Sequence, residues 1–424
     1  MHTLKEIYQD NEERNFIDPS LYSRYRVKAG LRNDNGTGVK VGLTKICDVI
    51  GYKIIHEKKY NIDGQLIYRG YPINYLVNKQ PSDKICGFEE TAYLLIFGTL
   101  PNADQLKTFK DYLLNFKMGP VDLQYETPSI LNALQIEVLK LYAKDPSADT
   151  DDLEERMMKG LKILASIPLF TFSYARNKVF KSYPYPDRSL AENILCMARG
   201  NDQYTFEEAK IMDTLLMIHA DHGGGNNSTF ANVVISSTGT DIYSCISAAI
   251  GSLKGPKHGG ANCKVTNMFK AIFHEVGFTT NQTTLKKIAN RILDKDFFDH
   301  SGLIYGIGHA IYTKSDPRAL LIHEQCEALA KSKGQEEIYN CIHAFEKVAI
   351  EVMKERKGID VCANVDYYSG YVYSLLGIEA DLFTPLFAIS RTAGWVSHHL
   401  ENRQSNRKLI RPANVYVGEM EEIK

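Results

Sequence analysis

From Tyr71 onward, apolar residues recur at the spacing of an α-helix, and this periodicity constrains the fold more than any other feature. Thr205 and Glu208 have the spacing of a capping box and predict a helix that runs to His219. Further helices are expected over 88–97, 244–253, 339–356 and 382–400. A clear apolar stripe follows Thr127-Pro128: Ile130, Leu131, Leu134, Val138 and Leu141.

The pattern differs between Lys40 and Arg69, where short β-like pieces replace the helical spacing. Asp63-Gly64 stands between apolar residues within 61–68, which is a hairpin signal. We therefore expect a mainly α fold: a many-helix globule with a small antiparallel β element near the N-terminus.

Length and charge narrow the class of protein. A chain of 424 residues is longer than one compact core usually spans, which favours two domains. The net charge of −1 argues against a nucleic acid or a membrane surface as partner, since both attract a basic surplus. No apolar run approaches the ~20 residues of a membrane span, and the residues after Met1 do not resemble a signal peptide.

The eight cysteines are scattered and form no C-x-x-C pair. Neither a zinc site nor a disulfide framework is therefore expected. This cysteine usage suits a reducing compartment, so we expect a cytoplasmic protein.

Three histidine-bearing segments coincide with glycine-rich breaks: 219–226, 255–262 and 305–312. Next to an imidazole, glycine lets a ligand approach the backbone closely. In the first segment, His219 and His222 could share a helical face and bind zinc, but they lack a convincing third ligand. The alternative is an ordinary helix C-terminus, although three glycines exceed what such a cap needs.

The other two histidines also have purely structural interpretations. His258 could be a surface residue of a tight turn, and His309 could be a buried side chain packed under a loop. The Gly-x-Gly before His309 follows no clear strand, so a dinucleotide-binding loop is rejected. Arg318 comes nine residues later, directly after a proline that restricts the backbone.

Two further charged residues lie in apolar surroundings. Asp366 is followed by two tyrosines, and partial desolvation would raise the basicity of its carboxylate; it could instead be a helix N-cap. Arg391 is crowded by apolar neighbours, and a buried guanidinium matches a carboxylate bidentately. This inventory suits a base that removes a proton from carbon, imidazoles that hydrogen-bond oxygens, and arginines that hold a polycarboxylate.

Five motifs, in this order, give the chain a close resemblance to the citrate synthase family: 219–226, 255–262, 306–318, 364–370 and 390–394. The resemblance extends from about Leu43 to Gly418. It implies a two-domain helical fold, with a large domain over 1–259, a small closing domain over 260–379, and a return to the large domain over 380–424.

The resemblance also implies a reaction, in which acetyl-CoA and oxaloacetate condense and the citryl thioester is hydrolysed. Asp366 matches the base that removes the methyl proton. His258 matches the donor to the enol oxygen, and His309 matches the donor that polarises the oxaloacetate carbonyl. No cofactor or metal is implied, because acetyl-CoA is a substrate.

The family's oxaloacetate-binding positions are matched by His222, Arg318 and Arg391, and Asn226 falls near that site. Arg411 matches an arginine that the neighbouring subunit contributes, which implies a homodimer.

The chain departs from the family pattern where CoA phosphates are expected to bind. Thr313 replaces a basic residue of many relatives, and we expect Lys314 to take its place in binding CoA.

Three alternatives stay open. The first is 2-methylcitrate synthase, which uses propionyl-CoA and shares the catalytic residues. The second is a metal-dependent hydrolase built on His219, His222, His258 and His309. The third is a catalytically inactive helical scaffold.

Overall fold

The structure is a computed structural model that describes residues 6, 9, 16–119, 123, 127–405 and 408–418. It separates into two compact units. The smaller unit joins residues 1–42 to 410–424 and includes the short helix α2 (Ser20–Arg24) and the 3₁₀ turn η2 (Ala29–Leu31). The larger unit comprises residues 43–409 and holds all the other helices and strands given below.

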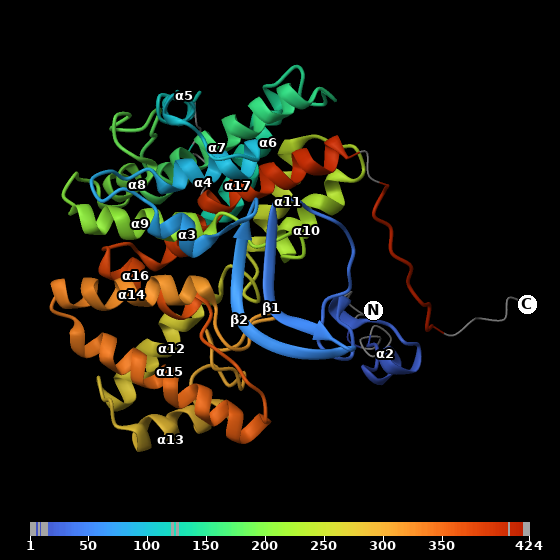
Figure 1. Cartoon of the computed structure of the whole chain (residues 1–424), viewed down its shortest axis with the longest axis vertical. Helices are drawn as coiled ribbons and strands as arrows, with labels where there is room; N and C mark the ends of the chain where they lie inside the picture. Colours follow the sequence, from blue (N-terminus) through green and yellow to red (C-terminus); the bar gives the residue numbers. More distant parts are fainter. Residues whose placement is uncertain are drawn as a thin grey trace, which may run out of the picture. The chain divides into compact units, whose positions relative to one another are not determined.

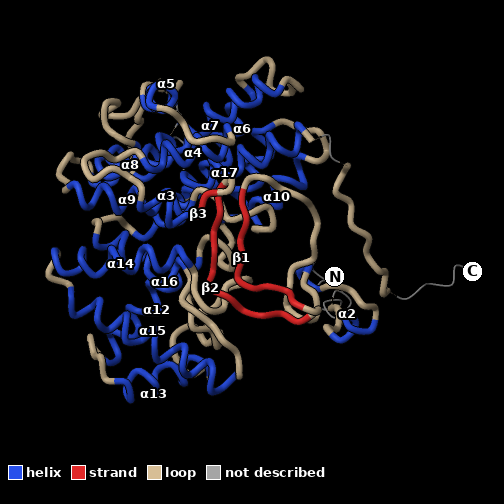
Figure 2. The backbone as a smooth tube through the Cα atoms, in the orientation of Figure 1, coloured by secondary structure: helices blue, strands red, loops and turns tan. Residues whose placement is uncertain are grey.

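One three-stranded antiparallel sheet, in the order β1-β2-β3, opens the larger unit. β1 (Cys47–Ile55) and β2 (Lys58–Tyr68) form a long curved ribbon, drawn in red in Figure 2, and β3 (Tyr71–Pro72) adds a short third strand. The register pairs Cys47 with Tyr68 and Ile55 with Lys58, with an irregularity between Ile50 and Tyr52. The predicted antiparallel element near the N-terminus is confirmed.

The predicted turn at Asp63-Gly64 is wrong, because both residues lie inside β2. The chain instead reverses at His56 and Glu57, whose φ angles are +47° and +63°. Gly64 is needed for a long-range reason: a Cβ there would lie 2.2 Å from the carbonyl oxygen of Ser315. The glycine therefore marks a close approach between two distant segments.

The rest of the larger unit is helical, as the sequence predicts. The helices are α3 (Ile73–Asn78), α4 (Gly87–Phe97), α5 (Ala103–Leu114), α6 (Ile130–Ala143), α7 (Leu153–Ala175), α8 (Leu190–Arg199), α9 (Phe206–His219), α10 (Asn227–Ser236), α11 (Ile242–Leu253), α12 (Ala261–Val276), α13 (Gln282–Leu293), α14 (Pro317–Ser332), α15 (Glu336–Lys357), α16 (Val365–Leu375) and α17 (Phe383–Gln404). A 3₁₀ turn, η3 (Ala380–Leu382), precedes α17.

Local end signals account for several helix boundaries. The Thr205–Glu208 capping box is formed at the start of α9. Gly98 ends α4 with a φ of +87°. The proline predicted in the first turn of the 127–141 helix falls outside it, because α6 begins at Ile130 after Ser129.

α17 is the central helix of the core. Its side chains are buried along most of its length, including Trp395 and Arg391. It packs against α4, α7, α9, α10 and α11, and also against α12. In Figure 1, helices α12 to α16, coloured yellow to orange, group together on one side of this core. Residues brought by α17 can therefore meet residues from both groups of helices.

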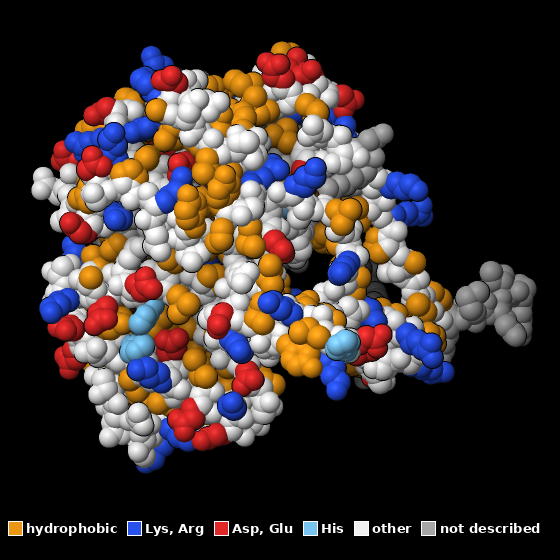
Figure 3. Space-filling model, in the orientation of Figure 1, with side chains coloured by type: hydrophobic (Ala, Val, Ile, Leu, Met, Phe, Trp, Pro, Cys, Tyr) orange, Lys and Arg blue, Asp and Glu red, His pale blue; other side chains and the backbone are white. Residues whose placement is uncertain are grey.

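The surface agrees with the near-zero net charge. On the face shown in Figure 3, acidic and basic side chains are interspersed, with no field of one sign. Within the described residues, no helix is both long and apolar enough to cross a membrane. The predicted domain boundaries at 259/260 and 379/380 both fall inside the larger unit and remain predictions.

Candidate active site

The loop that carries His309 runs beside the start of α16, which carries Asp366. The Gly308 N–H donates to the Cys362 carbonyl oxygen at 2.8 Å. Asn364 Nδ2 in turn donates to the Gly308 carbonyl oxygen at 2.8 Å. The Asn364 N–H also donates to the Gly306 carbonyl oxygen at 2.9 Å, so both the backbone and the side chain of Asn364 join these two segments.

Asp366 lies in the first turn of α16 and is mostly buried. It is not the helix cap, as its alternative reading had it; the cap is Asn364, whose Oδ1 accepts the Asp366 N–H at 3.0 Å. Burial raises the pKa of Asp366 to about 7, with Asp316 raising it further while Arg318 and Arg391 lower it. A carboxylate of this kind is a stronger base than an exposed aspartate.

The hydrogen bonds of His309 determine its tautomer. Its Nδ1 accepts the backbone N–H groups of Ile311 and Tyr312, each at 3.1 Å. The ring also stacks on Tyr312, with centroids 4.7 Å apart. In the neutral imidazole the proton is therefore on Nε2, which can act as a donor.

His222 packs edge-on against His309, with ring centroids 5.1 Å apart. Its pKa is held well below its usual value by burial first, then by the charges of Arg318, His309, Arg391 and His258. His222 is therefore neutral at physiological pH. Its Nε2 is buried and has no hydrogen-bond partner among the described residues.

Two of the three predicted arginines, Arg318 and Arg391, have different hydrogen-bond partners. Arg318 is engaged by Asp316, with Nε–Oδ1 at 3.0 Å and Nη2–Oδ2 at 2.7 Å. Arg391 donates only its Nε, to the His219 carbonyl oxygen at 2.7 Å, and stacks on Phe387 with its Cζ 4.6 Å from the ring centroid. Its Nη1 and Nη2 are buried and have no partner within the described chain. That open fork matches a carboxylate.

His258 lies in the turn between α11 and α12, 3.0 Å from Ser228 Oγ through its Nε2. The same hydroxyl accepts the Trp395 Nε1–H at 3.2 Å and lies 3.0 Å from Asn226 Oδ1. Burial, with a smaller contribution from Arg391, lowers the pKa of His258 to about 4. The ring is therefore neutral, and the Ser228 hydroxyl donates its one proton to Asn226 Oδ1.

We expect Ser228→Ala to lower kcat of the expected condensation about fivefold. The reason is that the hydrogen bond that orients the His258 ring contributes roughly 1 kcal/mol. Ser236→Ala is the matched control, since Ser236 is also buried on α10 but bonds to Asn402. Steady-state kinetics of both variants would check this. Equal losses in the two variants would contradict an orienting role for Ser228.

Three contact residues were missed by sequence reasoning: Ser228, Phe387 and Asp316. Phe387 precedes Arg391 by four residues, one helical turn, and its ring also meets His219 and His258. Asp316 directly precedes the proline that opens α14 and caps that helix. This position was a usable signal, whereas nothing in the local sequence marks Ser228.

Two further predicted binding residues, Arg411 and Lys314, are exposed. Arg411 belongs to the smaller unit, 410–424 with 1–42. Lys314 lies on the loop between His309 and Arg318. Their roles remain predictions.

The metal-hydrolase alternative finds no support in the geometry. Within the described ranges, no group of three or more histidine, cysteine, aspartate or glutamate side chains could hold a metal ion. The His219 Nδ1 lies 2.7 Å from the Leu215 carbonyl oxygen, within its own helix. Burial lowers the pKa of His219 to about 3, with Arg318 contributing, so its ring is neutral.

Comparisons with known proteins agree with these observations. The family model described as "Citrate synthase, C-terminal domain" matches residues 33–413. A citrate synthase of Haloferax volcanii is 37% identical over 87% of this chain and 94% of the relative, and one of Deinococcus radiodurans is 35% identical over 84% and 90%. A protein named 2-methylcitrate synthase 1, from Corynebacterium glutamicum, is 32% identical over 83% of this chain and 89% of its own length.

A solved structure agrees over the whole fold. The ternary complex of a citrate synthase with carboxymethyl coenzyme A and oxaloacetate, from the archaeon Thermoplasma acidophilum, superposes with a TM-score of 0.78 at 26% identity. The match covers 94% of this chain and 98% of that one. The resemblance inferred from the five motifs is thereby confirmed: the chain belongs to the citrate synthase family.

Proposed function

We propose that this protein condenses acetyl-CoA with oxaloacetate and, with water, releases citrate and CoA. The observation that carries the proposal is the cluster around Arg391. The charge of Arg391, a buried guanidinium with an open fork, acts on the neutral rings of His222 and His258 and on the Asp366 carboxyl, whose pKa is about 7. That combination suits the binding of a dicarboxylate next to a second substrate whose carbon loses a proton.

In the proposed first step, the Asp366 carboxylate takes a proton from the thioester methyl group, and the electron pair moves onto the thioester oxygen. His258 would donate a hydrogen bond to that oxygen, which fits its neutral ring. A preorganised donor of this kind contributes roughly 3–4 kcal/mol to stabilising the charge that develops.

In the second step, the enol carbon attacks the ketone carbon of oxaloacetate and forms the new C–C bond. The ketone oxygen takes a proton, and His309 Nε2 is the proposed donor, since its Nδ1 already accepts two backbone N–H groups. Water then cleaves the citryl thioester, which gives citrate and CoA. Acetyl-CoA enters as a substrate, and no bound cofactor takes part in these steps.

We propose that oxaloacetate binds between Arg391 and Arg318, with His222 and Asn226 beside them. The open fork of Arg391 suits one carboxylate of the substrate. Arg318 would bind the other through guanidinium atoms that Asp316 leaves accessible, while Asp316 offsets its charge.

The quaternary and domain assignments belong to the same proposal. A homodimer would allow Arg411 of one subunit to reach the site of its neighbour, and Lys314 would meet the CoA phosphates. The 260–379 domain would close over the substrates, and orienting two bound reactants in this way can contribute ~7–11 kcal/mol.

The direct test is release of a free thiol when purified protein meets oxaloacetate and acetyl-CoA. Turnover that needs both substrates and survives a strong chelator would support the proposal. No thiol release under any condition would favour the inactive scaffold, and loss of activity with chelator would favour a metal enzyme.

A second candidate is 2-methylcitrate synthesis from propionyl-CoA, favoured by the 32% identity to the Corynebacterium protein. One methylene in an apolar pocket discriminates only about 10–200-fold. The ratio of kcat/KM for acetyl-CoA and propionyl-CoA would decide which substrate is preferred.

The raised pKa of Asp366 predicts the pH dependence of the reaction. Only the carboxylate can act as a base, so kcat/KM should rise tenfold per pH unit below about 7 and level off above it. Thiol release measured between about pH 5 and 9 would check this. A profile already flat at pH 5 would contradict the assignment, because an unperturbed aspartate has a pKa near ~3.9.

A further inference from the structure

We propose that Asp221 and His398 form a positioning pair that fixes Arg391 and His222 for dicarboxylate binding. The inference rests on the proposed function, since it concerns the oxaloacetate pocket. Neither residue was singled out in the sequence as a site residue. Neither would touch the substrate: Asp221 directly precedes His222 in the chain, and His398 contacts Asp221.

Side chains and backbone on one face of α17 hydrogen-bond to three consecutive residues, from the last residue of α9 onward. Arg391, Gly394 and His398 are spaced three and four apart, so they lie on the same helical face. Arg391 Nε donates to the carbonyl oxygen of residue 219, the Gly394 N–H to that of residue 220 at 3.1 Å, and His398 Nε2 to a carboxylate oxygen of Asp221. Three consecutive residues are thus aligned along α17.

Gly394 makes this close contact possible. A Cβ at this position would lie 2.5 Å from the Ala220 carbonyl oxygen and 2.6 Å from Asp221 Oδ1. The turn before His222 is therefore pressed directly against the helix that carries Arg391. A shift of either segment would change the distance between the two proposed ligand-binding groups.

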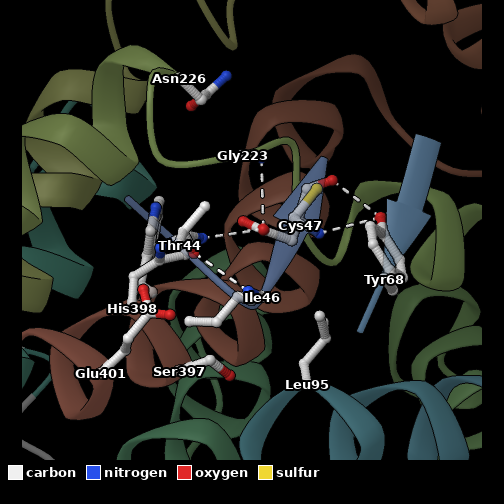
Figure 4. Close-up of polar contacts among 12 residues, drawn as sticks. Thr44, Ile46, Cys47, Tyr68, Leu95, Gly223, Asn226, Ser397, His398 and Glu401 are labelled. Carbon is white, nitrogen blue, oxygen red and sulfur yellow. Dashed lines mark hydrogen bonds and ion pairs between the residues drawn. The ribbon is translucent and has the colours of Figure 1, made fainter. Parts of the chain in front are cut away.

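Asp221 also connects this turn to Gly223 and to Tyr68 of β2. Its Oδ2 accepts His398 Nε2–H at 3.0 Å and the Gly223 N–H at 3.3 Å. The Tyr68 hydroxyl, from β2, donates to the Asp221 carbonyl oxygen at 2.8 Å and accepts its N–H at 3.1 Å. Figure 4 labels three of these partners, His398 from α17, Gly223 from the glycine turn and Tyr68 from the sheet.

The charges in this cluster are arranged to leave the Arg391 fork open. Asp221 is fully buried; burial raises its pKa, but His398 and Arg391 together hold that pKa below its usual value, so it is ionised. In the described part of the chain, its carboxylate hydrogen-bonds to His398 and to the Gly223 N–H rather than to Arg391. Asp221 therefore offsets the buried charge of Arg391 without occupying Nη1 and Nη2.

The test uses the full-length enzyme and separates binding from turnover. In Asp221→Asn and Asp221→Ala, we expect the oxaloacetate Kd and KM to rise about tenfold or more, as for partners that orient ligand-binding groups elsewhere. The loss should be larger for alanine, because asparagine keeps an acceptor for the Gly223 N–H. We expect kcat and the KM for acetyl-CoA to change less than threefold. Calorimetry with oxaloacetate alone gives the Kd without any turnover.

His398 gives an independent pair of variants should the Asp221 variants fail to fold. His398→Gln keeps a donor toward Asp221, whereas His398→Leu removes it. We expect the leucine variant to raise the oxaloacetate Kd about tenfold and the glutamine variant to restore most of the binding. A folded His398→Leu enzyme with wild-type oxaloacetate affinity would overturn the proposal.

Asp213→Asn is the matched control for a merely structural effect. Asp213 is a buried carboxylate on α9 that accepts the Gly87 and Phe88 N–H groups at 2.8 and 2.9 Å. Its loss should lower Tm but leave the oxaloacetate KM unchanged. An equal rise in KM in both aspartate variants would refute a specific role for Asp221. Wild-type enzyme without thiol release would instead refute the proposed function.

Discussion

Asp366→Asn is expected to lower kcat for condensation by about 10²–10⁴-fold, the contribution of a well-placed proton-transfer group. Asparagine keeps the shape of the side chain but cannot accept the methyl proton. The oxaloacetate Kd should change little, because the open fork of Arg391 and the Nε2 of His222 are untouched. Single-turnover kinetics and calorimetry with oxaloacetate would measure the two quantities separately.

Asp360→Asn is the control for this substitution. Asp360 is exposed and pairs with Lys354 at 3.2 Å, a surface contact worth about 0–1 kcal/mol. It should leave kcat and both KM values at wild-type levels. Wild-type turnover in Asp366→Asn would show that Asp366 is not the base that removes the methyl proton.

Asp366→Asn should also stabilise the folded protein at high pH. The folded pKa of Asp366, about 7, is raised above its unfolded value, so its stability contribution is fully present below the unfolded pKa and lost as pH rises through 7. Asparagine does not ionise. Its Tm should therefore exceed that of the wild type at pH 8 and equal it near pH 4, as thermal unfolding would show.

Arg391→Lys is expected to raise the oxaloacetate Kd by roughly 10–150-fold, which corresponds to the loss of one charged hydrogen bond. Charged hydrogen bonds contribute about 1.5–3 kcal/mol each, and a lysine cannot reproduce the two parallel bonds of a guanidinium fork. The positive charge is kept, so the loss reports on geometry. Calorimetry with oxaloacetate would measure it.

Arg403→Lys provides the comparison on the same helix. Arg403 pairs with Asp151 near the end of α17 and does not contact the cluster. We expect its oxaloacetate Kd to match the wild type. An Arg391→Lys enzyme that binds oxaloacetate normally would show that the open fork does not hold a substrate carboxylate.

Helix boundaries were predictable where the signals are local. The Thr205 capping box depends on residues within one turn and is confirmed, and the glycines at 98 and 358 end α4 and α15 by an equally local signal. The turn at Asp63-Gly64 was wrong because the reason for Gly64 is Ser315, 251 residues away. A local rule cannot include such a contact.

For the candidate site, the sequence by itself determined the chemical inventory: histidines at glycine breaks, an aspartate among tyrosines and an arginine inside an apolar helix. Residue type and spacing suffice for that, and the family followed from the order of the motifs. Only the tertiary structure decided that the pKa of Asp366 is near 7, that the fork of Arg391 is open while that of Arg318 is engaged, and that Asp221 and Ser228 support them. Burial and partner choice are properties of side chains that meet across long stretches of chain, so no window of sequence contains them.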